Sequence, residues 1–305
     1  MAGSIIGAGF ATGKELQLFF QSSTADSLCY LGLSILLMAV VSVLYFINQK
    51  ERHPSTAIQH LSNVLFLLFS GASCLVMFAC GGETLSESFS IPSLLGNLAT
   101  CIITLWIASK GITSIYRFNL IATPILFSVI VVLSLIGISV PAGSFATQQP
   151  PAFNMLVYTG YNLLSVLPFL AAIERNTNQK TGTKGILLGF SLILIAALLI
   201  KAFLNLHHDM IADSALPMMK LVGMIHPILT HLYTVMLYLS ILTTAINSLY
   251  AVSRGKKTVA IGCVLFVLSL FGFTALLETL YPIFGCLGIG VVLLILWETL
   301  FSKAK

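Results

Sequence analysis

The chain has 305 residues, of which 57% are hydrophobic and only 8% charged, against about 25% charged residues in an ordinary soluble domain. Apolar runs recur to the end of the chain, and the composition therefore predicts an all-α polytopic membrane protein. The sequence argues against an exported soluble protein, because the apolar N-terminus has no preceding basic region and no clear cleavage site. The net charge of +5 reflects membrane topology, as shown by the loops described below.

The first predicted span covers residues 1–22 and contains Gly3, Gly7, Gly9 and Gly13. Each glycine weakens a helix by roughly 1 kcal/mol relative to alanine. Unwound backbone is tolerated in a membrane only where protein buries it or water reaches it. We therefore predict a helix broken near residues 7–9, with a half-helix beginning near Phe10. Its free amides and positive end favour a carboxylate, and the candidate substrate-binding residues are Gly7, Ala8, Gly9 and Phe10. The alternative is a helix-packing face of small residues.

Further apolar runs of about 20 residues predict nine more spans. They cover residues 27–48, 57–81, 92–109, 114–140, 153–173, 183–206, 227–252, 258–275 and 276–301. A charge-free linker at 141–152 separates a first five-helix unit, 1–140, from a second, 153–305. Five spans per unit place the second unit in the membrane with inverted orientation, which is typical of secondary transporters.

Most of the 15 Lys and Arg residues lie in the loops on one side of this topology. They include Lys50, Arg52, Lys110, Arg117, Arg175, Lys180, Lys184, Arg254, Lys256 and Lys257. The opposite loops carry mainly acidic residues such as Asp26, Glu83 and Asp209. Because cytoplasmic loops hold the excess of positive charge, we predict a protein of the plasma (inner) membrane with both termini cytoplasmic and the 141–152 linker extracellular.

An inverted repeat predicts that span six is broken at the position that matches span one. Two residues, Gly160 and Asn162, interrupt its apolar run, and Pro168 follows. The candidate substrate-binding residues here are Tyr158, Thr159, Gly160, Tyr161 and Asn162. Alternatively, the tyrosines are anchors at the membrane interface.

Span eight presents hydroxyl groups on Ser240, Thr243 and Thr244. Hard cations prefer oxygen ligands, and unwound carbonyls of Gly3 and Ile6 in span one would complete a shell around a sodium ion. The alternative is that these hydroxyl groups bond back to carbonyls of their own helix.

Charged residues within the spans are expensive in lipid and are usually functional or paired. Glu15 lies about two turns beyond the predicted break, which suits an outer gate or a proton carrier, and Glu278 is a second candidate. Adjacent residues do not face each other on a helix, so Lys14 is not the simple partner of Glu15. For Glu278 the alternative is a position near the outer surface, from which the side chain reaches water.

Other chemistries have no support in the sequence. The six cysteines lie in apolar runs without a Cys-x-x-Cys spacing, so we predict neither disulfide nor metal site. No nucleotide-binding loop, zinc-protease signature or catalytic triad is recognisable. We therefore expect no enzymatic activity, no nucleic-acid partner and no cofactor other than a bound sodium ion.

The string IIGAGFATGKEL in span one, the tyrosine-rich span six and the Thr243–Thr244 pair resemble LeuT-type transporters of the amino acid-polyamine-organocation superfamily. The closest resemblance is to a poorly characterised bacterial branch with about ten spans. It implies a five-plus-five inverted repeat with discontinuous helices 1 and 6. By this resemblance, the backbone of span six binds the amino group of the substrate, and paired hydroxyl groups on span eight face carbonyls of span one around sodium. Fewer residues precede Gly7 than in such transporters, so we expect either a start upstream or a truncated first helix.

Together these features predict a secondary active transporter that works by alternating access. Its expected partners are the lipid bilayer and a small amino-acid-like solute that carries a carboxylate. Coupling to sodium is favoured over coupling to protons. The alternative is a channel or a solute-sensing membrane protein built on the same scaffold.

Overall fold

The computed structural model describes residues 7–21, 25–51, 56–110, 112–138, 152–174 and 177–301, and these ranges form helices joined by turns, without strands. The predicted all-α polytopic architecture is confirmed. The first span consists of two short helices, α2 (Ala8–Thr12) and α3 (Lys14–Phe19). The helices that follow are α4 (Ala25–Glu51), α5 (Thr56–Phe89), α6 (Ser93–Ser109), α7 (Ile112–Ile138), α8 (Ala152–Glu174), α9 (Gln179–Leu206), α10 (His208–Ile211), α11 (Pro217–Ile225), α12 (Pro227–Ser253), α13 (Thr258–Ser269) and α14 (Phe273–Phe301).

Five of the described helices are long and apolar enough to cross a membrane by length and composition alone. They span Asp26–Ile47, His60–Phe89, Gln179–Leu206, Pro227–Ser253 and Phe273–Trp297. Shorter apolar helices cover Ser93–Ser109, Pro124–Ile138 and Thr258–Ser269. Large apolar side chains face outward, among them Trp106, Ile228 and Phe271. An exterior of this kind fits a lipid surround.

Two predicted boundaries are wrong. Helix α5 continues to Phe89, past the predicted end at residue 81. The turn between the last two spans is at Gly272, where φ is 90°, and not at residues 275–276. Glycine adopts this left-handed conformation without a Cβ clash, so the chain turns there although both flanking segments are apolar. The division into units 1–140 and 153–305 stays a prediction, and most of the linker lies outside the described residues.

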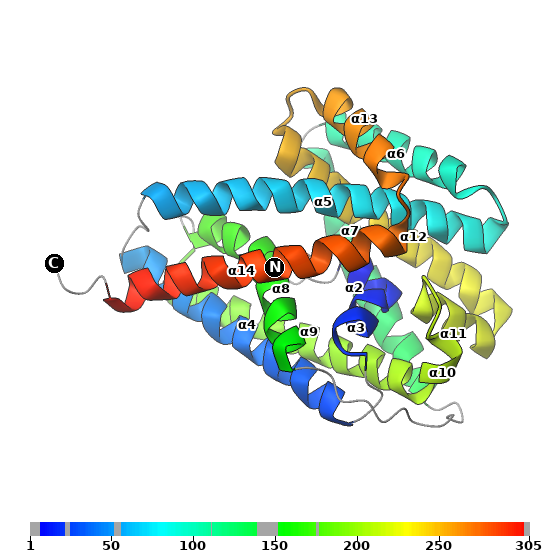
Figure 1. Ribbon diagram of the computed structural model, residues 1–305, viewed down its shortest axis with the longest axis horizontal. Helices are drawn as coiled ribbons and strands as arrows, with labels where there is room; N and C mark the ends of the chain where they lie inside the picture. The colour runs from blue at the N-terminus through cyan, green and yellow to red at the C-terminus, as the bar shows by residue number, and fades with distance from the viewer. Residues whose placement is uncertain are drawn as a thin grey trace.

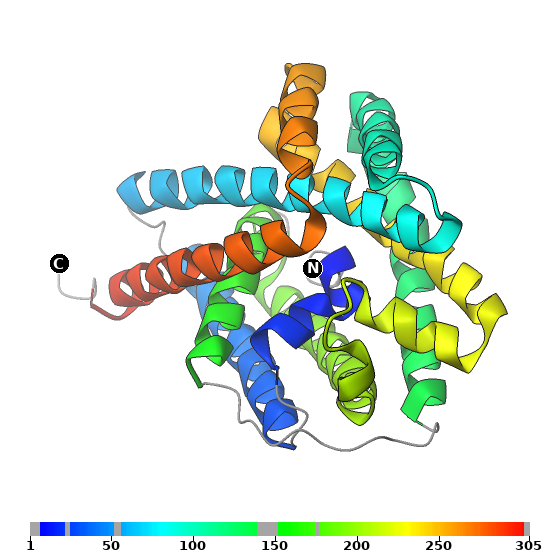
Figure 2. The ribbon, with the colours of Figure 1, turned by 45° about the vertical axis from the view of Figure 1, so that its right-hand side comes forward.

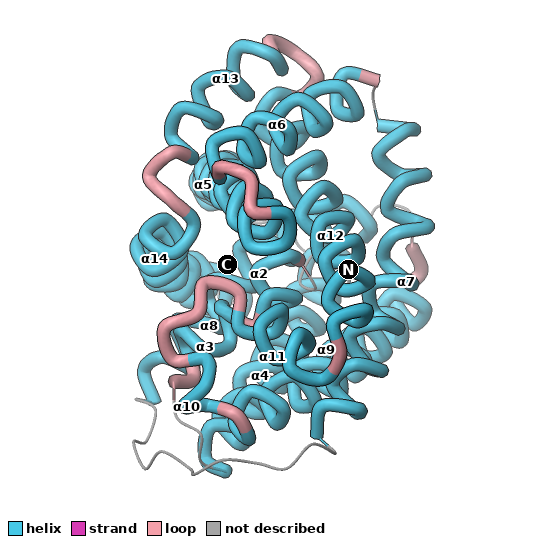
Figure 3. Tube along the Cα trace, turned by 90° about the vertical axis from the view of Figure 1, so that its right-hand side faces the viewer, coloured by secondary structure: helices cyan, strands magenta, loops and turns pink. Residues whose placement is uncertain are grey.

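The two short helices of span one lie at the centre of the molecule. Figure 1 shows α5 and α14 running side by side across it, with α4 and α9 on the same flank as α3. In Figure 2, α2 and α3 are enclosed by α8, α11, α12 and α14. Helices α6 and α13 pack against α5 at one edge, far from α10, as Figure 3 shows. Every residue of α2 is buried.

Helix α8 is continuous from Ala152 to Glu174, so the predicted break at residues 158–162 is wrong. Gly160 has a different use. A Cβ added to it would lie 2.3 Å from the carbonyl oxygen of Gly285, and one added to Gly288 would lie 2.1 Å from the carbonyl oxygen of Gly160. The backbones of α8 and α14 therefore touch through glycines, in the manner of small-residue interfaces between membrane helices.

The close crossing of α8 and α14 can be tested with two substitutions on α14. Gly288→Ala should lower the thermal unfolding midpoint, because an added methyl at a close crossing costs about 1–3 kcal/mol. Gly290→Ala is the control, since a Cβ there meets nothing within 4 Å. The measurement is thermal unfolding of both purified variants. Equal midpoints would contradict the close packing of α8 on α14.

Candidate functional site

The first span is broken at Gly13, which adopts the left-handed conformation with φ 75° and ψ −9°. Gly7, in extended conformation, precedes the first turn of α2. Gly7 is not helical, which agrees with the predicted break near residues 7–9, although the half-helix that follows begins at Ala8 and not near Phe10. The interruption at Gly13 was not predicted. Among the described glycines of this span, Gly13 alone has a positive φ, and periodicity does not reveal which glycine adopts it.

Side chains satisfy the backbone groups that this break releases. The Gly13 amide donates to the Phe10 carbonyl at 3.1 Å instead of continuing the α-helical ladder to Gly9. The Thr12 hydroxyl donates to the Gly9 carbonyl at 2.8 Å. The Tyr233 hydroxyl, on α12, donates to the Ala11 carbonyl. Buried backbone groups need such partners, so these two hydroxyl groups make a broken helix tolerable in the protein interior.

Glu15 lies directly beyond the break and is 3% exposed. Its Oε2 atom lies 2.7 Å from the place where a Cβ on Gly9 would stand. Its Oε1 atom is buried and has no hydrogen-bond partner among the described residues. Asn162 of α8 lies beside the carboxylate. Within the described ranges, one oxygen atom of the carboxylate is therefore free for a ligand.

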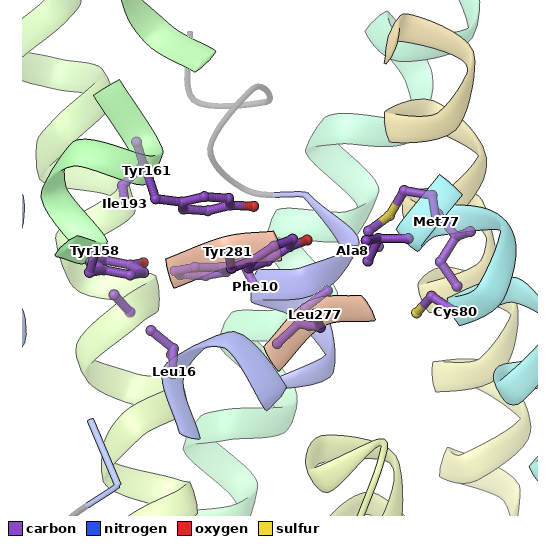
Figure 4. Packing of buried hydrophobic residues seen from close by; sticks show 14 of the residues in the cluster. Ala8, Phe10, Leu16, Met77, Cys80, Tyr158, Tyr161, Ile193, Leu277 and Tyr281 are labelled. Carbon is purple, nitrogen blue, oxygen red and sulfur yellow. The ribbon is translucent and has the colours of Figure 1, made fainter. Parts of the chain in front are cut away.

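Three tyrosines surround Glu15, namely Tyr158, Tyr161 and Tyr281. The rings of Tyr161 and Tyr281 are stacked, with centroids 4.3 Å apart, and the Tyr158 ring packs against Phe19 and Phe20 of span one. Figure 4 shows the three tyrosines entering from α8 and α14 with their hydroxyl ends directed toward α2. The Tyr158 hydroxyl is buried and has no partner among the described residues. The result is an aromatic enclosure with polar atoms on one side.

Lys14 points away from Glu15, as the sequence predicts. Its ammonium group donates to the carbonyl oxygen of Ser214, between α10 and α11, at 3.2 Å. The same group lies 3.9 Å from Oε1 of Glu278 on α14. The Glu278 side chain is 50% exposed, which fits the predicted position near a membrane surface. Lys14 thus connects α3 both to the α10–α11 segment and to α14.

The hydroxyl group of Thr244 lies close to Gly7, the residue that precedes α2. Its Oγ1 atom lies 3.2 Å from the place of a Cβ on Gly7. Both Thr243 and Thr244 also bond back to the Ser240 carbonyl, at 2.7 and 3.0 Å. The Ser240 hydroxyl is buried without a partner among the described residues. Thr244 therefore places one hydroxyl oxygen of span eight against span one, while the predicted ligands Gly3 and Ile6 lie outside the described residues.

The predicted substrate residues of span six divide into two groups. Tyr158, Tyr161 and Asn162 gather around Glu15, as described above. Thr159 instead bonds to the Met155 carbonyl at 2.8 Å and to the Ser34 carbonyl of α4 at 3.5 Å, and Gly160 packs on α14. Both therefore join helices and do not face the carboxylate.

Two residues of the site were missed in the sequence. Tyr281 follows Glu278 by three residues, so it lies almost one turn deeper in the same helix. The sequence signal for Tyr281 was its position one turn inward from Glu278, an acidic residue near the end of the same helix. Tyr233 carries no comparable signal, because its role depends on a carbonyl that a distant helix break sets free.

Comparisons with known proteins agree with this architecture. No family model matches the chain. YyaD of Bacillus subtilis strain 168, an uncharacterized protein, is 23% identical over 326 residues, which cover 99% of this chain and 96% of YyaD. YkvI of the same organism, an uncharacterized membrane protein, is 24% identical over 321 residues, which cover 95% of this chain and 91% of YkvI. The predicted resemblance to a poorly characterised bacterial branch is thereby confirmed.

Two solved structures share the fold. The crystal structure of MhsT in complex with L-phenylalanine gives a TM-score of 0.64 at 15% identity and covers 95% of this chain and 86% of MhsT. The inward-facing conformation of Mhp1 gives a TM-score of 0.55 at 13% identity and covers 96% of this chain and 72% of Mhp1. Both have the LeuT fold. The chain therefore has the LeuT fold, as its sequence predicts.

The hydrogen bond to Ala11 can be tested by Tyr233→Phe. An unsatisfied buried carbonyl costs about 1–3 kcal/mol, so this variant should unfold at a lower temperature and exchange the amide hydrogens of residues 8–19 faster. Tyr238→Phe on the same helix is the control, because its partner Thr100 also donates to the Gly96 carbonyl at 2.8 Å. Unchanged exchange in residues 8–19 would show that Tyr233 does not support the break.

Proposed function

We propose that the protein is a secondary active transporter that moves a small amino-acid-like solute by alternating access. One observation carries this proposal: a buried carboxylate with a free oxygen lies beside a broken helix at the centre of a LeuT fold. Such transporters bind solute and ion near the membrane midplane, where discontinuous helices expose backbone groups. A helix broken by one positive-φ glycine supplies both the polar groups and a point of flexure.

The proposed coupling ion is sodium, bound where α12 meets the start of span one. Support comes from the approach of the Thr244 hydroxyl to Gly7 and from the Ser240 hydroxyl, which is buried without a partner among the residues that the structure describes. A threonine that donates to its own helix keeps lone pairs for a cation. The back-bonding seen at Thr243 and Thr244 is therefore compatible with a role as ligands, and Gly3 and Ile6 remain proposed carbonyl ligands.

For the solute, the proposed contacts are the amides at the start of α2 and the aromatic side chains around Glu15. The first amides of a helix have no acceptor within it, which supports the proposal that those of Ala8, Gly9 and Phe10 bind the carboxylate of the solute. The neighbour MhsT has been solved with L-phenylalanine, and an aromatic enclosure suits a solute of similar size. Lys14 and Glu278 would close the site from outside, since they join α3 to α14.

Uptake into proteoliposomes tests the proposed function. The purified full chain should accumulate labelled L-phenylalanine or another amino acid from a mixed pool, and an inward sodium gradient should increase the initial rate. If no cation gradient changes the accumulation, the proposed coupling to a cation is wrong. Currents far above carrier rates, or solute binding without flux, would indicate the channel or sensor.

Thr244→Val should weaken the dependence of uptake on sodium by at least severalfold, because it removes an oxygen atom while keeping the shape. Thr279→Val is a matched control, since the Thr279 hydroxyl also bonds back to its own helix, at 2.8 Å from the Ala275 carbonyl, but is exposed. The measurement is the initial uptake rate as a function of sodium concentration. An unchanged sodium profile in Thr244→Val would rule out this ligand.

Glu278→Gln should change transport more than stability. A partly exposed ion pair contributes about 0–1 kcal/mol, so the unfolding midpoint should move little. Loss of the pair should speed the opening of the outer side, which is measured as faster exchange of internal labelled solute for external solute. Exchange at the wild-type rate would show that Glu278 takes no part in gating.

A further inference from the structure

The carbonyl groups of α8 are not available to a ligand, because the helix is unbroken. In an α-helix each carbonyl except those of the last turn accepts from an amide of the same helix. A positively charged amino group therefore needs another acceptor at this depth. Among the described residues, the Oε1 atom of Glu15 is a buried acceptor without a partner beside α8.

We propose that Glu15 binds a cationic ammonium group of the transported solute, with the aromatic rings of Tyr161 and Tyr281 beside it. This inference rests on the proposed function and names the recognised chemistry: a primary or substituted amine, whether or not the solute also has a carboxylate. Glu15 is thus a binding residue, in addition to the gate and proton roles that its position suggests.

The charge balance around Glu15 supports this assignment. A buried carboxylate is costly unless an opposite charge and hydrogen bonds compensate it. Within the described ranges, the structure records no ion pair for Glu15, and the nearest basic residue in sequence, Lys14, is engaged by Ser214 and Glu278. The missing positive charge can therefore come from the solute.

The aromatic residues favour an organic cation over a metal ion. Ring faces attract ammonium groups by about 0.5–2 kcal/mol, whereas a metal ion needs several oxygen ligands. The rings around Glu15 form a connected set, because Phe69 contacts both Tyr161 and Phe284 edge-on. The Tyr158 hydroxyl, buried without a described partner, supplies an acceptor for a second N–H of the ammonium group.

Three compounds with one carbon skeleton separate the contributions of the two charged groups. L-Phenylalanine has both groups, 2-phenylethylamine has only the amine, and 3-phenylpropionate has only the carboxylate. We expect 2-phenylethylamine to bind the purified full chain and to raise its unfolding midpoint, and 3-phenylpropionate to bind at least tenfold more weakly. Stronger binding of 3-phenylpropionate than of 2-phenylethylamine would overturn the inference.

Glu15→Gln should weaken binding of 2-phenylethylamine about thirtyfold or more, the change expected when one member of a buried charge pair is neutralised. The control is Glu83→Gln on α5, the same chemical change at a partly exposed position. Without ligand, Glu15→Gln should unfold at the wild-type temperature or above, because it removes a buried acid that has no ionic partner. A lower midpoint together with wild-type affinity would assign Glu15 a structural role and contradict the proposal.

Failure of this inference can be distinguished from failure of the proposed function. If proteoliposomes accumulate a solute and Glu15→Gln takes it up with unchanged KM, the transporter stands and the ammonium contact is wrong. If wild type binds 2-phenylethylamine through Glu15 but moves no solute, the contact stands and the protein is a sensor.

Discussion

The arrangement depends on one constraint: a polar backbone group within a membrane protein needs a hydrogen-bond partner, even where a helix is interrupted. At Gly13 the interruption is confined to a single residue with positive φ. The hydroxyl groups of Thr12 and Tyr233 donate hydrogen bonds to the carbonyls of Gly9 and Ala11, respectively. The first span can therefore lie broken at the centre of the protein. Since Tyr233 belongs to α12, the break is tied to the helix that also presents Thr244 to Gly7.

Hydrophobic length was sufficient to predict the order of the spans, because crossing a bilayer requires a minimum apolar run whatever the tertiary structure. The use of each glycine could not be predicted in the same way. Gly13 turns the chain, whereas Gly160 and Gly288 bring two helices into contact. Both uses look alike in one sequence, since the difference lies in φ and in the element on the opposite side. The turn at Gly13 was therefore missed, although the non-helical position of Gly7 was predicted, and span six was wrongly predicted to be broken.

The functional residues were predictable in type but not in pairing. Glu15 stood out because ionisable groups are rare in apolar segments. Asn162 stood out because it interrupts the apolar run of span six, and Tyr158 and Tyr161 because they flank that interruption. The partners of Lys14, by contrast, are Ser214 and Glu278, which lie far away in the sequence. Lys14 and Glu15 have different surroundings because adjacent residues on a helix do not face each other. A contact between distant helices leaves no periodic signal.

Span one is interrupted, whereas span six is one continuous helix, and this difference affects how each can move. Helix α8 is held along its length by the glycine crossing with α14 and by the bond from Thr159 to the Ser34 carbonyl of α4, so it behaves as a rigid support. The short helices α2 and α3 are joined by one glycine and are fixed mainly through side chains. Relative motion should therefore concentrate in span one, where hinge residues absorb a change in φ and ψ. A solute held between Glu15 on the mobile segment and Tyr161 on the rigid one would connect the two, and its release would require only that α3 move.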